Sequence, residues 1–190
     1  MLGKTNVSGF LLVQVVLAIA IVALAMAVAI PSLTRRMPLY EQREFTTKLN
    51  AFMAEVWQQG LISQKIQKVV FDLDKREAVL EQETDDLDAA TQEPLYKPVA
   101  LQYAGHITWP ETLEIKQFFI QGADELSSSS HRTTNALWMY VLPEGMAQEV
   151  IINILNTKNP PPYQEGRKLS LVLNPITVQF KSYDEFQNPS

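Results

Sequence analysis

Few residues in this sequence have the chemistry of a catalytic site. The chain of 190 residues contains no cysteine and two histidines, so only His106 and His131 could act as imidazole bases. Three serines lie beside His131 in the polar stretch "SSSSHRTTN" (127–135), which indicates a flexible connection between strands. A hydrolase needs a nucleophile, a base and an orienting group that converge in space. No motif that would bring such groups together is present, and we therefore expect no enzyme and no catalytic residues.

A cluster of carboxylate side chains is the second place in the sequence where a functional site could form. The segment 81–93 contains no basic residue and carries the carboxylates Glu81, Glu83, Asp85, Asp86, Asp88 and Glu93. A calcium loop needs oxygen ligands at alternating positions and a glycine for its turn, and this segment lacks that glycine and the full spacing. Two distant histidines are a weak basis for a metal site, and phosphate-binding glycine patterns are missing. We expect a solvated, mobile loop here, no bound metal and no cofactor.

The charge distribution separates the beginning of the chain from the rest. There are 16 Lys and Arg residues against 21 Asp and Glu residues. No acidic residue precedes Glu41, so residues 37–190 hold 13 of the basic groups and all 21 acidic ones. Nucleic-acid binding depends on clustered Lys and Arg, and we expect no nucleic-acid partner for this acidic part.

A long apolar run lies near the N-terminus and precedes all the other expected elements. Residues 10–30 contain no charge and no glycine, and a helix of that length spans about 30 Å, the thickness of a bilayer core. A cleaved secretory signal has a shorter apolar core, and a core helix of a soluble protein has a polar face. The run therefore predicts a single membrane span. Counting the positive charges Lys4, Arg35, Arg36 and Arg43 would weakly place the C-terminal side in the cytoplasm.

The residues around this run resemble a type IV prepilin-like signal. The leader "MLGKTNVSG" ends in Gly9, the run begins with Phe10, and Pro31 is residue 22 when Phe10 is counted as residue 1. The resemblance implies that a membrane peptidase cuts on the cytoplasmic side after Gly9, and that Phe10 becomes N-methylated. This implied orientation disagrees with the positive-charge count, and both are carried forward as expectations.

One position departs from the family pattern. The fifth mature residue is usually glutamate in this family, where it is thought to align an incoming subunit by pairing with a neighbour's N-terminal amine. Here it is Gln14, whose amide forms hydrogen bonds and carries no charge. Either any polar residue suffices near a helix end, or the missing charge marks a subunit at the filament tip. Gln14 and Pro31 are the assembly residues that the resemblance implies.

The chain after the run changes its period twice. Apolar residues recur at helical spacing at Leu49, Phe52, Met53 and Val56, which predicts an amphipathic helix ending near Gly60 or shortly after it. Pro31 is expected to kink this long helix without breaking it. From about residue 66 short apolar strands follow, with breaks at 143–145, 159–162 and 174–175. The expected strands are 68–74, 78–82, 98–104, 113–120, 136–142, 149–155, 169–174 and 177–183.

These elements predict an α+β fold with an antiparallel β-sheet or sandwich after a long N-terminal helix. The stretches "LPEGMAQEVIINIL" and "GRKLSLVLNPITVQF" resemble the C-terminal half of the H-type minor pseudopilins of type II secretion, a family shared with type IV pilus minor pilins. The resemblance implies a pilin-like fold with a leader (1–9), a transmembrane segment (10–31), a continuing amphipathic helix (32–65) and a periplasmic β domain (66–190).

The function that the resemblance implies is assembly. We expect a minor pseudopilin in the bacterial inner membrane that helps to initiate or cap the periplasmic pseudopilus, which drives protein export across the outer membrane. Its expected partners are the membrane, other minor and major pseudopilins, the prepilin peptidase and the inner-membrane assembly platform. Two alternatives stay open, a minor pilin of a type IV pilus for priming, adhesion or DNA uptake, and a single-pass membrane-anchored periplasmic binding domain.

Overall fold

The computed structural model describes residues 7–34, 37–89, 91–102, 105–127, 135–157 and 166–189, with side chains in the N-terminal part given for 12–27 and from Tyr40 onward. The chain forms two compact units, Met1–Met37 and Pro38–Ser190, which are described separately here. The first contains helix α1 (Val7–Thr34). The second contains helix α2 (Met37–Ser63), which begins at the boundary, and all the strands.

The long N-terminal helix expected from the sequence is two helices. Helix α1 includes Pro31 and ends three residues later, at Thr34, and α2 begins at Met37; Arg35 and Arg36 lie outside the described residues. Pro38 is a physical reason for the separation, because a proline lacks the N–H that would continue the hydrogen-bond ladder and fits best in the first turn of a new helix. In the described part of the chain, no helix has the length and apolarity needed to cross a membrane.

Helix α2 has the amphipathic face that its sequence predicts. Leu49, Phe52, Met53 and Val56 are completely buried. The helix ends where Gln64 adopts a left-handed conformation (φ 54°) and donates its N–H to the Gly60 carbonyl at 3.0 Å, a common way to satisfy the last carbonyls of a helix. The expected helix end near Gly60 is confirmed.

The first sheet is antiparallel and has the strand order β3-β2-β1-β7, with β4 also paired to β2. Its strands are β1 (Gln67–Asp72), β2 (Glu77–Leu87), β3 (Pro94–Pro98), β4 (Ile107–Thr108) and β7 (Ala136–Val141). The hairpin expected between the first two strands is confirmed by the pairing of Val70 with Val79. Alternate residues of β1 and β7 are buried, so one face of this sheet contributes to the core.

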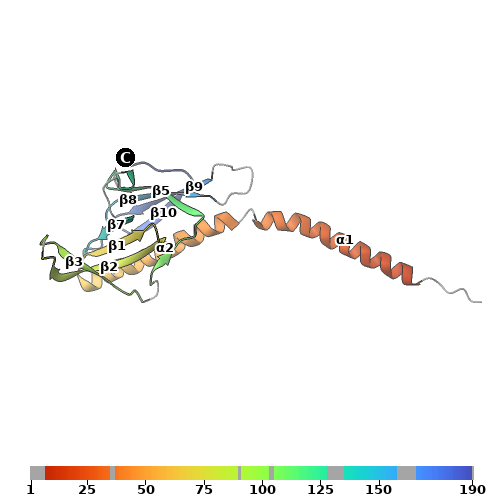
Figure 1. Ribbon diagram of the computed structural model, residues 1–190, viewed down its shortest axis with the longest axis horizontal. Coiled ribbons are helices and arrows are strands. Elements are labelled where there is room, and N and C mark those ends of the chain that lie inside the picture. Colours follow the sequence, from red (N-terminus) through yellow and green to blue (C-terminus); the bar gives the residue numbers. More distant parts are fainter. Residues whose placement is uncertain are drawn as a thin grey trace, which may run out of the picture. The chain divides into compact units, whose positions relative to one another are not determined.

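The second sheet is also antiparallel, with the strand order β10-β9-β8-β5-β6. Its strands are β5 (Leu113–Ile120), β6 (Ala123–Asp124), β8 (Val150–Asn156), β9 (Arg167–Asn174) and β10 (Gln179–Tyr183). The expected α+β class with antiparallel sheets is therefore confirmed (Figure 1).

Two sequence predictions within the sheets are wrong. The strand expected at residues 98–104 ends where it was expected to begin, because β3 covers Pro94–Pro98. Leu101 is buried outside any strand, so its apolar character reflects core packing. The acidic loop expected at 81–93 is largely strand, since β2 extends through Leu87 and pairs with β3. In the acidic segment, pairing with the next strand overrides the weak strand propensity of the local sequence.

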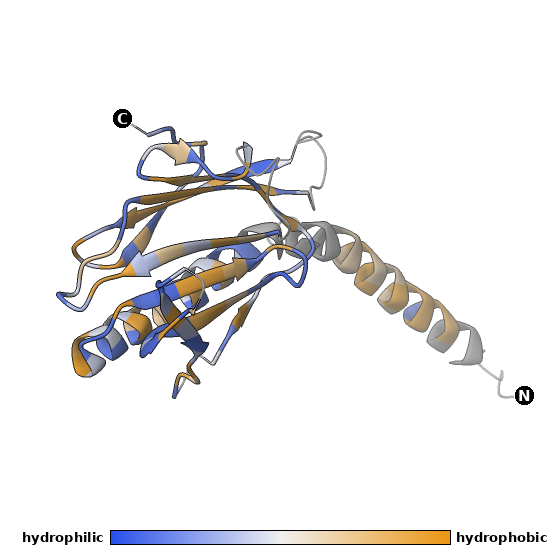
Figure 2. Cartoon of the chain, turned by 60° about the vertical axis from the view of Figure 1, so that its left-hand side comes forward, coloured by the Kyte–Doolittle hydropathy of each residue, from blue (hydrophilic) through white to orange (hydrophobic). Residues whose placement is uncertain are grey.

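A single core joins the two sheets and α2. Phe71 of β1 and Phe118 of β5 meet edge to face, with ring centroids 5.3 Å apart, which places the two sheets in direct contact. Phe45 of α2 contacts Trp109 at a centroid distance of 6.1 Å. In Figure 2 the strands alternate between apolar and polar residues along their length, as expected for sheets with one face in the core.

The turn between β7 and β8 is fixed to α2 by Trp57. The indole Nε1–H of Trp57 donates to the Gly145 carbonyl at 2.9 Å. Gly145 has φ +84°, and a Cβ atom there would lie 2.8 Å from Trp57 Nε1 and 3.3 Å from Leu61 Cδ2. This position therefore requires glycine for its backbone conformation and for space.

We expect Gly145→Ala to lower the free energy of unfolding by more than Gly122→Ala, measured by thermal denaturation of the full chain in mild detergent. Gly122 also has a positive φ (+88°), but a Cβ there meets only Pro189 Cβ at 3.9 Å, so this control carries backbone strain of about 1–2 kcal/mol alone. Gly145→Ala adds displacement of the indole and loss of its hydrogen bond, about 0.5–1.5 kcal/mol more. Equal losses in the two variants would show that the Trp57 contact contributes nothing.

The β1–β2 turn holds Asp72 in its charged form. The backbone N–H groups of Lys75 and Asp74 donate to Asp72 Oδ1 at 2.9 and 3.1 Å. These bonds, chiefly the one from the Lys75 backbone, hold the pKa of Asp72 below its usual range, and the Lys75 ammonium adds to the effect.

We expect an NMR titration of the Asp72 carboxyl to show a midpoint below the ordinary value of about 3.9. A lowered carboxyl pKa stabilises the fold above the ordinary value, and that contribution is lost as the pH falls through the folded-state pKa. Because the backbone bond is the largest cause, Lys75→Gln should keep part of the lowering. A return to the ordinary midpoint in Lys75→Gln would assign the effect to the ammonium instead.

Candidate assembly helix and the second unit

The site residues predicted from the sequence lie on one helix. Gly9, Phe10, Gln14 and Pro31 all fall within α1 (Val7–Thr34). Gln14 follows Phe10 by four residues, so the two positions share a face and lie about 6 Å apart along the axis. The side chains of Phe10 and Pro31 lie outside the described residues, as do all of residues 1–6 of the predicted leader.

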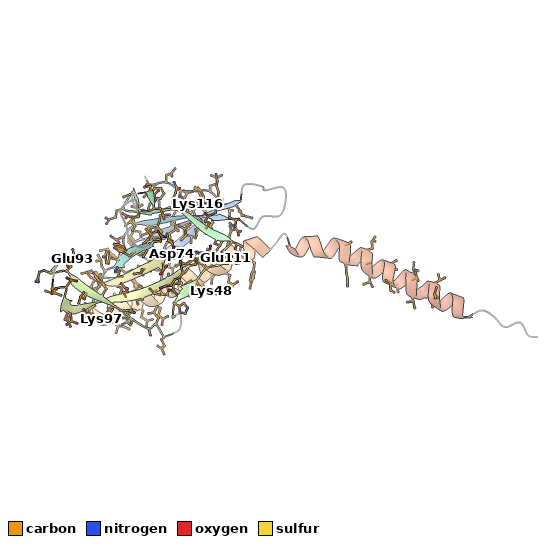
Figure 3. All side chains as sticks on the ribbon, in the orientation of Figure 1. Lys48, Asp74, Glu93, Lys97, Glu111 and Lys116 are labelled. Carbon is orange, nitrogen blue, oxygen red and sulfur yellow. The ribbon has the colours of Figure 1, made fainter. Side chains whose placement is uncertain are left out.

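The described part of α1 has no polar face. Among residues 12–27 Gln14 is the single polar residue, and it is exposed. The large apolar side chains of this part are between 52% and 74% exposed: Leu12, Val13, Val15, Val16, Leu17, Ile19, Ile21, Val22, Leu24 and Met26. Figure 2 shows the described residues of α1 as predominantly apolar, and Figure 3 shows their side chains projecting from different sides of the helix.

The exposed apolar side chains of α1 determine which interactions this helix can make. Complete burial of one such side chain stabilises a protein by about 1.5–3 kcal/mol, and an all-apolar helix needs an apolar surrounding on every side. The Gln14 amide offers two donor hydrogens and an acceptor oxygen, and no charge. The helix can therefore pack and form a hydrogen bond, and its described side chains contain no nucleophile, acid or base.

Side-chain amides close two edges of the second unit, a feature that the sequence analysis missed. Asn50 of α2 donates from Nδ2 to the Phe180 carbonyl at 2.9 Å and accepts from the Phe180 N–H at Oδ1 at 2.7 Å, so it takes the place of a neighbouring strand on β10. Gln148 accepts from the Tyr140 N–H at 2.9 Å on β7. Edge strands left unpaired invite further pairing, and these two positions are occupied from within the chain.

A third amide ties the C-terminal segment to the middle of the second sheet. Asn153 is completely buried; its Nδ2 donates to the Gln187 carbonyl at 2.9 Å and to Gln117 Oε1 at 2.8 Å. Its Oδ1 accepts from the Gln187 N–H at 3.2 Å. Asn153 interrupts the apolar run of residues 150–155, and a polar residue inside such a run is the signal that could have revealed the contact.

The acidic residues of β2 lie beside lysines. Lys65 Nζ is 3.0 Å from Asp85 Oδ1, Lys68 Nζ is 3.1 Å from Glu81 Oε2, and Lys97 Nζ is 2.8 Å from Asp86 Oδ2; Lys97 is labelled in Figure 3. The hydrogen bond and charge of Lys97 hold the pKa of Asp86 below its usual range. Among the described residues, no three His, Asp or Glu side chains are grouped closely enough to hold a metal ion.

Only one of the two histidines, His106, lies in the described part of the chain. His106 is exposed and precedes β4. His131 and Ser128–Ser130 lie outside the described residues, so the expectation about this stretch stays a prediction.

No protein-family model matches the chain, and no curated protein matches it. Among solved structures, it is similar to a structure of the minor pseudopilin EpsH from the Type 2 Secretion System of Vibrio cholerae, with 14% sequence identity and a TM-score of 0.49 over 78% of this chain and 99% of that one. A second structure of the same pseudopilin has 14% identity and a TM-score of 0.44, over 74% of this chain and 96% of that one.

Proposed function

We propose that the chain is a minor pseudopilin of a bacterial type II secretion system, which helps to initiate or cap the periplasmic pseudopilus that drives protein export across the outer membrane. It acts by assembly and not by catalysis. The observation that carries the proposal is α1, a helix that contains the Gly9–Phe10 pair near its start. Its described side chains are apolar on all sides, with Gln14 as their only polar group.

The exposed side chains of α1 require an apolar environment, and the sequence signature is consistent with two such environments. Before assembly, the inner membrane surrounds the helix and the second unit lies in the periplasm. In the filament, the corresponding helices of other minor and major pseudopilins replace the lipid. Because apolar side chains stay out of water in both places, the transfer does not cost the full free energy of exposing them.

The sequence signature also assigns a processing step to this helix. The prepilin peptidase removes residues 1–9 on the cytoplasmic side, and Phe10 becomes the methylated N-terminus. The assembly platform of the inner membrane then receives the subunit, with Gln14 one helical turn from the new amine.

The processing step is tested by the intact mass of the full chain from cells with and without prepilin peptidase. We expect a peptidase-dependent loss of residues 1–9 and a mass increase of one methyl group on Phe10. Gly9→Val should block the cut, because a branched side chain hinders close approach of an enzyme to the backbone. Gly3→Val, in the same leader, is the matched control and should be cut normally.

An uncleaved chain in cells that contain active peptidase would contradict both filament functions. That outcome would favour a membrane-anchored periplasmic binding domain, which keeps its leader. Deletion in a host that has both a type II secretion system and a type IV pilus would separate the two filament functions. The pseudopilin function predicts loss of protein export with normal piliation, and the pilin function predicts the reverse.

The role of Gln14 is tested by Gln14→Glu and the similarly sized Gln14→Met. A carboxylate can pair with the N-terminal amine of a neighbour, and such charge-assisted hydrogen bonds are about twice as strong as neutral ones. We expect Gln14→Glu to raise the number of copies recovered per sheared pseudopilus, because the subunit can then enter along the filament. Gln14→Met should not raise it. If neither variant changes the copy number, the amide has no part in placing the subunit.

A further inference from the structure

A cleft of about 430 Å³ lies between the beginning of α2 and the ends of β9 and β10, entirely within the second unit. Its polar lining includes Gln42, Arg43, Thr47, Arg167, Ser182 and Asp184. Further along α2 the same helix face is fully apolar and buried. The cleft is therefore where the core between the helix and the second sheet gives way to polar side chains.

The lining carries a local positive charge in an otherwise acidic unit. Arg43 comes from α2 and Arg167 from β9, and no described residue forms an ion pair with Arg43. Arg167 Nη2 lies 3.2 Å from Asp184 Oδ1, with the two side chains 37% and 79% exposed. A pair this exposed is readily exchanged for another partner. Among the described residues that line the cleft, two guanidinium groups and one carboxylate leave a balance of one positive charge.

Gln42 gives this cleft an unused hydrogen-bonding group. Its side chain is only 4% exposed, and Nε2 is buried without a hydrogen-bond partner among the described residues. A buried amide without partners is unfavourable. The last torsion of a glutamine has two broad minima, so rotation can turn the amide donors toward an acceptor bound in the cleft.

We propose that this cleft binds a single carboxylate group. Guanidinium groups hold carboxylates through two parallel hydrogen bonds, and the Gln42 amide and the hydroxyls of Thr47 and Ser182 supply further donors. A balance of one positive charge matches a monoanion. A phosphate dianion would instead place excess negative charge beside Asp184. The proposal does not depend on the filament function, and the carboxylate belongs either to an acidic side chain of another polypeptide or to a small free acid.

The site is tested by NMR titration of the full chain in nonionic detergent, following the side-chain NH₂ signals of Gln42. The probes are acetyl-Gly-Glu-Gly-amide, acetate and inorganic phosphate. We expect saturable shifts with a carboxylate and weaker binding of phosphate. Tighter binding of the peptide than of acetate assigns the ligand to a polypeptide, and the reverse order assigns it to a free acid.

Matched variants separate a local site from overall charge. Arg43→Gln and Arg167→Gln should each weaken carboxylate binding about tenfold, the effect of losing a charge-assisted hydrogen bond. Lys181→Gln removes the same charge from the residue next to Ser182, on a side chain outside the cleft lining, and should change binding less than about twofold. No saturable shift, tighter binding of phosphate, or equal effects of all three substitutions would overturn the proposal.

Discussion

The second unit depends on the burial of one face of α2 against the core that the two sheets share. Leu49, Phe52 and Met53 are completely buried, and the two hydrogen bonds of Asn50 to Phe180 join the helix to the edge of the second sheet. At the far end of α2, Trp57 binds the β7–β8 turn through Gly145. Contacts from α2 therefore hold the edge of the second sheet and the β7–β8 turn in place. Displacing α2 would expose the core and a strand edge together.

The same chain contains a helix with the opposite property. Helix α2 divides its residues between an apolar and a polar face, and the apolar face from Phe45 to Val56 is buried within the unit. Helix α1 has no such division in residues 12–27, and its large side chains are more than half exposed. Burial of these α1 side chains, and the stabilisation that it gives, therefore requires a partner or a lipid phase outside the chain. This contrast is the physical basis for assigning assembly to α1 and a stable folded body to the second unit.

Local patterns predicted much of the second unit. The end of α2 and the strands β5, β7, β8 and β9 depend on residues close in sequence, and they lie within one or two residues of where they were expected. The start of α2 at Met37 lies five residues after the expected start. Prediction was wrong where strand pairing overrides composition. The acidic residues between 81 and 87 are poor strand formers, and pairing with the neighbouring strands β1 and β3, with Lys68 beside Glu81 and Lys97 beside Asp86, places them in β2.

The candidate site was predictable only as a set of positions. Gly9, Phe10, Gln14 and Pro31 are implied by the resemblance to a prepilin-like signal, and all lie in α1. The separation after Thr34 does not follow from the apolar pattern, and Pro38 in the first turn of α2 is its local signal. The amide contacts of Asn50 and Asn153 link residues 130 and 34 positions apart, and the cleft at Gln42 joins three separate elements. No local pattern contains those contacts.

Cysteine labelling tests most directly whether α1 is shielded from water by lipid or by other subunits. The chain has no cysteine, so Ala18→Cys, Ala25→Cys and the exposed Thr177→Cys each provide one thiol. In isolated membranes from producing cells, a charged maleimide should label Thr177→Cys and leave both α1 positions unlabelled until the samples are denatured. Labelling of all three thiols at the same rate would contradict the account, because α1 would then lie open to water.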